Sequence, residues 1–191
     1  VAYTAMDSVK DYLDEIKTRL VAAKQPGVDK TKIQAEIDQL KEQITGISQS
    51  ASFSGSNWLS INSDTDDTEQ TIVSSFSRAS DGTVSVGTIT IDTADIALFD
   101  AGAGNGLLEA EDAAALGIAD IDLASLDADA GPTIDDFISA VENMTDRVTS
   151  AAADLGAYKS RVDMQKDFVT ALMDAVDRGV GQLVDADMNQ E

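Results

Sequence analysis

The hydrophobic residues near the start of the chain recur at the spacing of an α-helix. Met6, Val9, Leu13, Ile16 and Leu20 follow one another at steps of three or four residues. This spacing places them on one face of a helix, with the polar residues outside it. We therefore predict a helix over residues 1–24. The Gln-Pro-Gly segment at 25–27 ends it, because proline disfavours helical geometry in the residue before it.

A second amphipathic helix is predicted directly after this turn, with Asp29 as its N-cap residue. Its apolar positions again step by three or four residues and are Ile33, Ile37, Leu40, Ile44 and Ile47. Because the connection between the two helices is short, we expect them to form an antiparallel hairpin.

The longest periodic pattern lies in the C-terminal third of the chain. Seven apolar residues stand there at intervals of seven: Val141, Val148, Leu155, Val162, Val169, Val176 and Leu183. Pro132 or Thr133 can open this helix. The helix dipole favours the acidic residues in its first turn. A single helix over 133–188 has a length of roughly 84 Å at 1.5 Å per residue. Such a helix predicts a rod-shaped molecule.

The periodicity changes in the middle of the chain. Residues 70–79 and 83–92 are rich in Val, Ile, Thr, Ser and Phe, and a Ser-Asp-Gly turn separates them. This pattern predicts a β-hairpin. Residues 93–131 have weak patterning, and we interpret them as short helical turns and loops lying on a small sheet.

These elements predict a mainly α protein with an α+β insertion. Residues 1–59 and 133–191 form an elongated helical rod, and 60–132 form an inserted acidic domain with a β-hairpin and loops. The core seam of the rod is predicted to contain Met6, Leu13, Leu20, Ile37, Ile44, Val148, Leu155, Val162, Val169 and Val176.

The acidic charge is concentrated in the predicted insertion. The chain has a net charge of −22, and residues 60–132 carry 15 acids and the single base Arg78. A segment this acidic faces solvent and repels nucleic acid. No apolar run reaches the length of a membrane span, and no cleavable signal peptide is visible.

The residue types present argue against an enzyme. The sequence has no histidine and no cysteine, which excludes the usual nucleophile–base pairs within this chain. The acidic series that starts at Asp127 fails the calcium-loop template, since Gly131 and Ile138 occupy two of its ligand positions. We expect no catalytic site, cofactor or metal, and we interpret the acidic clusters as solvated loops.

Four local strings resemble bacterial flagellins, and they occur in the family's order. Residues 33–44, beginning Ile-Gln-Ala-Glu-Ile, resemble the second core helix, and 53–59 resemble the turn that follows it. The string Asp-Leu-Gly-Ala at 154–157, with Arg161, matches the C-terminal core helix. Residues 179–191 resemble the entry to the last filament helix of alphaproteobacterial flagellins.

The resemblance implies a structural subunit of the flagellar filament that self-assembles for motility. It implies other flagellin subunits, the export apparatus, and cap and junction proteins as partners. It also implies an extracellular location, reached without a cleavable signal peptide. The terminal helices of the filament core are expected to be missing at both ends, so we expect a soluble monomer that cannot build normal filaments.

Many flagellins are bound by an innate-immune receptor, and the resemblance assigns the equivalent positions to Tyr12, Asp14, Ile16 and Glu36. Receptor-binding members have basic residues where this chain has Tyr12 and Asp14. Reversing charge in a binding patch weakens binding. We therefore expect weak or absent receptor activation.

Two alternatives remain open from the sequence. A hook–filament junction protein shares the core helices of flagellin and differs in where it assembles. A secreted calcium-binding or polysaccharide-binding module is the alternative from another class, and it uses the acidic insertion.

Overall fold

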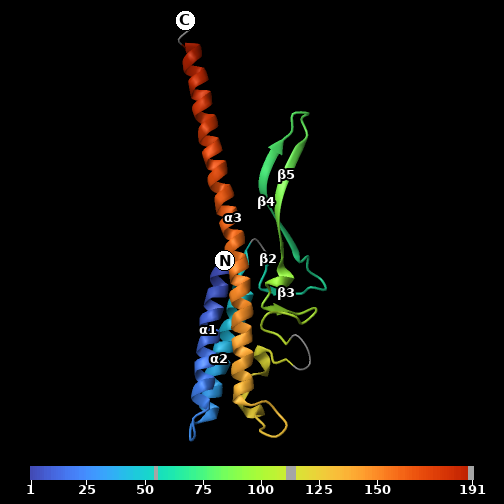
Figure 1. Ribbon diagram of the computed structural model, residues 1–191, viewed down its shortest axis with the longest axis vertical. Coiled ribbons are helices and arrows are strands. Elements are labelled where there is room, and N and C mark those ends of the chain that lie inside the picture. Colours follow the sequence, from blue (N-terminus) through green and yellow to red (C-terminus); the bar gives the residue numbers. More distant parts are fainter. Residues whose placement is uncertain (54–55, 111–114, 189–191) are drawn as a thin grey trace. The chain divides into compact units, whose positions relative to one another are not determined.

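The computed structural model describes residues 1–53, 56–110 and 115–188 (Figure 1). Contacts divide the chain into two compact units. The first contains Val1–Gln70 and Thr90–Leu155, and the second contains Thr71–Ile89 and Gly156–Glu191. Each unit is described by itself below.

Helices α1 (Ala2–Ala23) and α2 (Lys30–Ser50) form the predicted antiparallel hairpin of the first unit (Figure 1). Their apolar faces meet, and Met6, Leu13, Leu20, Ile37 and Ile44 are completely buried. The turn between the helices contains Gly27, whose φ of 81° lies in the left-handed region that favours glycine.

The start of α2 is capped as predicted. The Oδ1 atom of Asp29 accepts hydrogen bonds from the main-chain N–H groups of Thr31, at 3.1 Å, and Lys32, at 3.4 Å. These bonds satisfy two donors that have no partner inside the helix.

Helix α3 (Ile134–Met188) contains 55 residues and continues through Gly156 without a break. Thr133 and Asp136 open it with reciprocal bonds. The Thr133 N–H donates to Oδ2 of Asp136 at 2.9 Å, and the Asp136 N–H donates to the Thr133 hydroxyl oxygen at 3.3 Å. This is the capping-box arrangement. The three helices account for most of the chain and confirm a mainly α fold with a few short strands.

The N-terminal part of α3 packs against the helical hairpin in the first unit. Its buried residues step by three, four and seven and include Phe137, Val141, Met144, Val148 and Leu155. Lys17 of α1 pairs with Glu142 of α3 at 2.9 Å, and Lys24, the residue directly after α1, pairs with Asp135 of α3 at 2.7 Å.

Short strands lie beside these helices. Strand β1 (Ser52–Phe53) pairs antiparallel with β2 (Ser56–Asn57), and β3 (Ser60–Ile61) pairs parallel with β6 (Phe99–Asp100). Leu59 and Leu98 are completely buried next to the parallel pair. Among the described residues, the single 3-10 turn η1 (Thr93–Asp95) precedes β6, and the turns η2 (Ile118–Asp120) and η3 (Leu123–Ser125) follow it.

The segment around η2 and η3 is bonded directly to α2. The ammonium of Lys41 donates to the main-chain oxygen of Ile121, and the amide oxygen of Gln34 accepts from Leu123 N–H at 2.8 Å. By their contacts, residues 60–70 and 90–131 group with α1 and α2 in the first unit, and the predicted domain over 60–132 stays a prediction. Local periodicity carries no signal for such contacts between residues that lie 80 and 89 positions apart.

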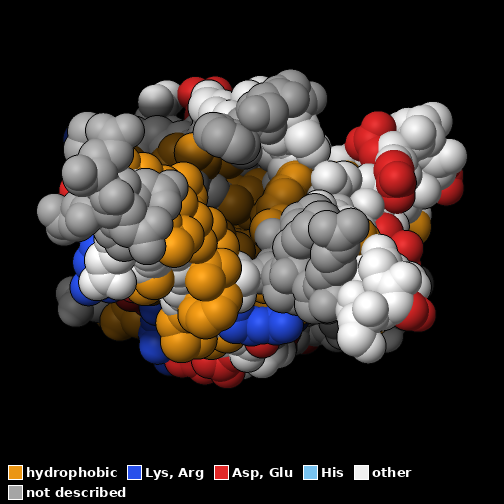
Figure 2. Space-filling view, turned by 90° about the horizontal axis from the view of Figure 1, so that it is seen from above, with side chains coloured by type: hydrophobic (Ala, Val, Ile, Leu, Met, Phe, Trp, Pro, Cys, Tyr) orange, Lys and Arg blue, Asp and Glu red, His pale blue; other side chains and the backbone are white. Residues whose placement is uncertain are grey.

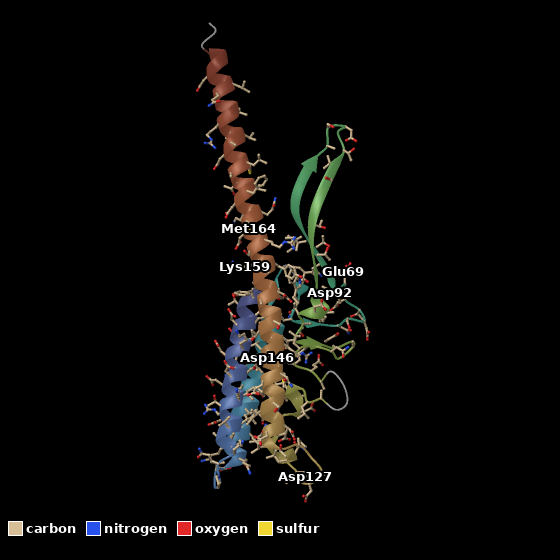
Figure 3. The ribbon with its side chains drawn as sticks, in the orientation of Figure 1. Glu69, Asp92, Asp127, Asp146, Lys159 and Met164 are labelled. Carbon is tan, nitrogen blue, oxygen red and sulfur yellow. The ribbon has the colours of Figure 1, made fainter. Side chains whose placement is uncertain are left out.

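The second unit contains most of the predicted β-hairpin. Strand β4 (Glu69–Arg78) pairs with β5 (Val84–Asp92) across the Ser-Asp-Gly turn. Gly82 has a φ of 88°, and the Asp81 carboxylate accepts from Thr83 N–H at 2.9 Å. Glu69 and Asp92 mark the two outer ends of these strands (Figure 3).

Candidate functional surface

An exposed apolar stripe runs along α3 in the second unit. We call it the α3 stripe, and it consists of Met164, Phe168, Val169, Leu172, Met173, Val176, Val180, Leu183 and Val184. These side chains are between 43% and 71% exposed. Figure 2 shows hydrophobic side chains lying open on the face that carries the C-terminal end of α3.

The stripe follows from the helical spacing of the sequence. Its members step by three, four or one, so they share one side of the helix. Acidic residues, among them Asp167, Asp174 and Asp185, stand at positions on the opposite side. Lys159 and Asp163 form an exposed ion pair at 3.1 Å one turn before the stripe begins. Lys159 and Met164 project from the same helix (Figure 3).

The predicted core seam is therefore buried over only part of its length. Val148 and Leu155 are buried, Val162 is half-buried, and Val169 and Val176 are 43% and 57% exposed. The prediction that Val169 and Val176 lie in a core is corrected for this chain. The residues of α3 that pack in the core of the first unit end at Leu155, and Val169 and Val176 belong to the second unit.

Contiguous apolar surface of this extent marks an interaction site in a water-soluble protein. Complete burial of one large apolar side chain contributes about 1.5 to 3 kcal/mol, and these side chains are already about half-buried. Complete burial of all nine side chains would add on the order of 10 kcal/mol of favourable free energy, before the entropic cost of association is subtracted.

The four receptor-patch positions do not form one exposed surface. Asp14 and Glu36 are exposed and Tyr12 is half-buried, whereas Ile16 is completely buried. Ile16 lies on the apolar face of α1 and is part of the core, and its equivalence to a receptor-patch position stays a prediction. Glu36 is paired with Arg19 of the neighbouring helix at 3.2 Å.

Acidic residues in the clusters of the first unit accept hydrogen bonds from main-chain N–H groups of the same loops. Asp66 accepts from Asn62 N–H at 2.8 Å, and Asp122 accepts from Ala124 N–H at 2.9 Å. Among the residues that the structure describes, no group of three His, Cys, Asp or Glu side chains is arranged to hold a metal ion. No helix in the described ranges has the length and apolar character that a membrane span requires.

Two titratable side chains with displaced pKa values hold loops in place. Burial lowers the pKa of Lys41, against the opposing charge of Asp38. Asp100 is only 5% exposed, and burial alone raises a carboxyl pKa. The main-chain N–H groups of Ser63 and Gly102 each donate to Asp100 at 2.9 Å and, with other donors in this loop, hold its pKa below 3.8. Sequence patterns missed both roles, since neither residue belongs to a periodic motif.

Two family models match the chain at its two ends. The bacterial flagellin N-terminal helical region matches residues 1–64, and the bacterial flagellin C-terminal helical region matches residues 138–191. The first match contains α1 and α2, and the second contains nearly all of α3.

Whole-chain comparisons point to the same family. Flagellin C of Rhizobium meliloti strain 1021 is 42% identical over 212 residues, covering 99% of this chain and 65% of the relative. Flagellin B of Rhizobium meliloti is 33% identical over 286 residues, covering all of this chain and 72% of the relative. A flagellin of Brucella melitensis biotype 1 is 35% identical over 198 residues, covering all of this chain and 61% of the relative.

The chain thus spans less than two thirds of the length of the first of these relatives. Its two helical ends and its whole sequence nevertheless match a single family, which consists of structural proteins of the flagellar filament and not of enzymes. The chain belongs to the bacterial flagellin family, of the type found in alphaproteobacteria.

Proposed function

We propose that this chain is part of a structural subunit of an extracellular flagellar filament and that the complete subunit polymerises with its own copies for motility. The observation that carries the proposal is the α3 stripe. Nine large apolar side chains at helical spacing remain exposed on a helix whose preceding residues are packed in a core. A second amphipathic helix of the assembled filament is the element that fits such a stripe.

We also propose the partners that the resemblance implies. The subunit is exported through the flagellar export apparatus without a cleavable signal peptide, and it meets the cap and junction proteins at the growing filament. The predicted placement of 60–132 on the filament surface is supported by its net charge of −14, because like charge keeps such segments apart and in solvent.

The relatives favour a filament subunit over a hook–filament junction protein, since the three described above are themselves named flagellins. The structure offers no metal-binding group among the described residues that favours a calcium-binding module.

Substitutions within the stripe test the proposal in the bacterium that makes this protein. Replacing Phe168 and Leu172 with serine removes apolar contact area without adding charge. We expect loss of swimming and few or short filaments by electron microscopy. The matched control replaces Asp167 and Asp174 with serine on the opposite side of the helix, and we expect it to retain filaments. Normal filaments from the Phe168→Ser/Leu172→Ser protein would refute the role of the stripe.

A further inference from the structure

Asn105 and Gly106 form the sole Asn-Gly pair of the sequence. In such a pair the main-chain nitrogen of glycine can attack the side-chain carbonyl of asparagine, because glycine carries no side chain that hinders the approach. Asn105 is exposed, so water reaches it. We propose that Asn105 is a site of spontaneous deamidation and that Glu109 holds its rate down in the folded protein.

Both main-chain polar groups of Gly106, its N–H and its carbonyl oxygen, are hydrogen-bonded. Its N–H donates to Oε1 of Glu109 at 3.2 Å, and the same oxygen accepts from Asp100 N–H. Its carbonyl oxygen accepts from Glu109 N–H at 2.9 Å and from the guanidinium of Arg147 at 3.4 Å. Gly106 itself is buried. The attacking nitrogen is therefore held in place by one glutamate side chain.

Steric crowding explains why a glycine stands at this reactive position. A Cβ atom on residue 106 would lie 2.3 Å from the main-chain oxygen of Leu98 and 2.6 Å from Oε1 of Glu109. The first of these atoms is backbone and cannot move aside locally. Another residue type at 106 would therefore disturb the loop, and the glycine that makes Asn105 reactive is required by the fold.

The reaction needs no oxidant or cofactor. Gly106 nitrogen loses its proton and attacks Cγ of Asn105, so a carbon–nitrogen bond forms. The bond from Cγ to the side-chain amide nitrogen breaks, and ammonia leaves with the proton. One water then opens the succinimide ring at either carbonyl, which gives aspartate or isoaspartate.

Glu109 opposes the first step in two ways. Its carboxylate lies against the N–H that must ionise, and a neighbouring negative charge disfavours a second one. Its hydrogen bond also holds the Gly106 nitrogen in one orientation, so attack requires the loop to open. Loss of Glu109 removes both effects.

Deamidation would alter the loop that it occurs in. It adds one negative charge to a segment that already has a net charge of −14. Isoaspartate also lengthens the main chain by one bond, directly before the bonds from Leu107 N–H to Ala97 and from Leu108 N–H to Leu98, at 2.8 and 3.1 Å. We expect the isoaspartate form to have a less ordered 97–108 loop.

Peptide mass spectrometry of protein incubated in ¹⁸O-labelled water at mildly alkaline pH measures the rate at Asn105. Wild type, Glu109→Ala and the exposed-site control Glu42→Ala are compared, each folded and in urea. We expect folded wild type and Glu42→Ala to react several-fold more slowly than the urea samples. Folded Glu109→Ala should approach the urea rate. Asn62, which precedes serine, provides an internal reference in every sample.

Equal rates in folded and urea-treated wild type would overturn the proposal. A Glu109→Ala protein that keeps its helical circular dichroism but reacts no faster than Glu42→Ala would overturn it as well. If Glu109→Ala does not fold, the deamidation rate of folded Glu109→Gln tests the role of Glu109 instead. This variant keeps an acceptor oxygen but lacks the charge, so its rate must exceed that of wild type, and an unchanged rate contradicts the role of Glu109.

Discussion

The ammonium of Lys41 in α2 donates a hydrogen bond to the main-chain oxygen of Ile121, a residue that lies 80 positions later in the sequence. The Lys41 side chain is 19% exposed, so this bond forms largely out of contact with water. Gln34, two turns earlier on α2, accepts from Leu123 N–H at 2.8 Å. These two side chains attach the loop segment 118–125 to the helical hairpin.

Replacing Lys41 with methionine removes a charged donor but keeps a long apolar stem. We expect a loss of about 1–2 kcal/mol in the free energy of unfolding, because a partly buried carbonyl loses a charge-assisted bond. Urea denaturation measures the change. The control Lys30→Met alters an exposed lysine at the start of the same helix and should remain within about 0.5 kcal/mol of wild type.

Asp100 gives a prediction for acid pH. Its pKa is lowered in the folded chain, so its carboxylate stabilises the fold above the ordinary value of 3.8, and this contribution is lost as the pH falls through the lower folded value. We expect Asp100→Asn to be less stable than wild type at neutral pH. The difference in stability between Asp100→Asn and wild type should disappear as the pH falls below 3.8. Thermal unfolding at a series of pH values measures it, and a gap that stays constant across the series would contradict this role.

The N-cap of α2 is a local test of the helical hairpin. Replacing Asp29 with alanine leaves the N–H groups of Thr31 and Lys32 without their acceptor. We expect a loss of about 1 kcal/mol in stability. Asp11→Ala, at an exposed position within α1, serves as the control. Equal effects of the two substitutions in urea denaturation would show that the cap contributes nothing.

Receptor recognition remains a prediction that concerns Tyr12 and Asp14. We expect weak activation of the innate-immune receptor by wild type in a reporter assay, because Tyr12 lacks the positive charge of receptor-binding members and Asp14 reverses it. Replacing both residues with arginine should raise activation. Wild-type potency equal to that of an enteric flagellin would refute the prediction.

Local sequence patterns predicted the helical part of the fold well. The spacing from Met6 to Leu20 identified the buried face of α1, and Asp29 was identified as the cap of α2. The Ser-Asp-Gly sequence also identified the turn between β4 and β5. Gly82 adopts the positive φ that this turn requires. Each of these features depends on residues a few positions apart.

Long-range features were beyond such patterns. The parallel pairing of Ser60 with Phe99 involves strands of two residues, which are too short to show alternation. The attachment of Ile121 to Lys41 rests on single side chains. The heptad spacing continued through Val169 and Val176 although both side chains are exposed. Periodicity identifies an apolar face but does not tell which molecule covers it.

Thiol labelling of the α3 stripe tests the central claim most directly, because the sequence contains no cysteine and Val176→Cys therefore provides a single thiol. The variant is alkylated in dissociated subunits and in filaments. We predict rapid labelling of subunits, where residue 176 is 57% exposed, and strong protection in filaments. Labelling of Cys at this position at the same rate in both states would contradict assembly through the stripe.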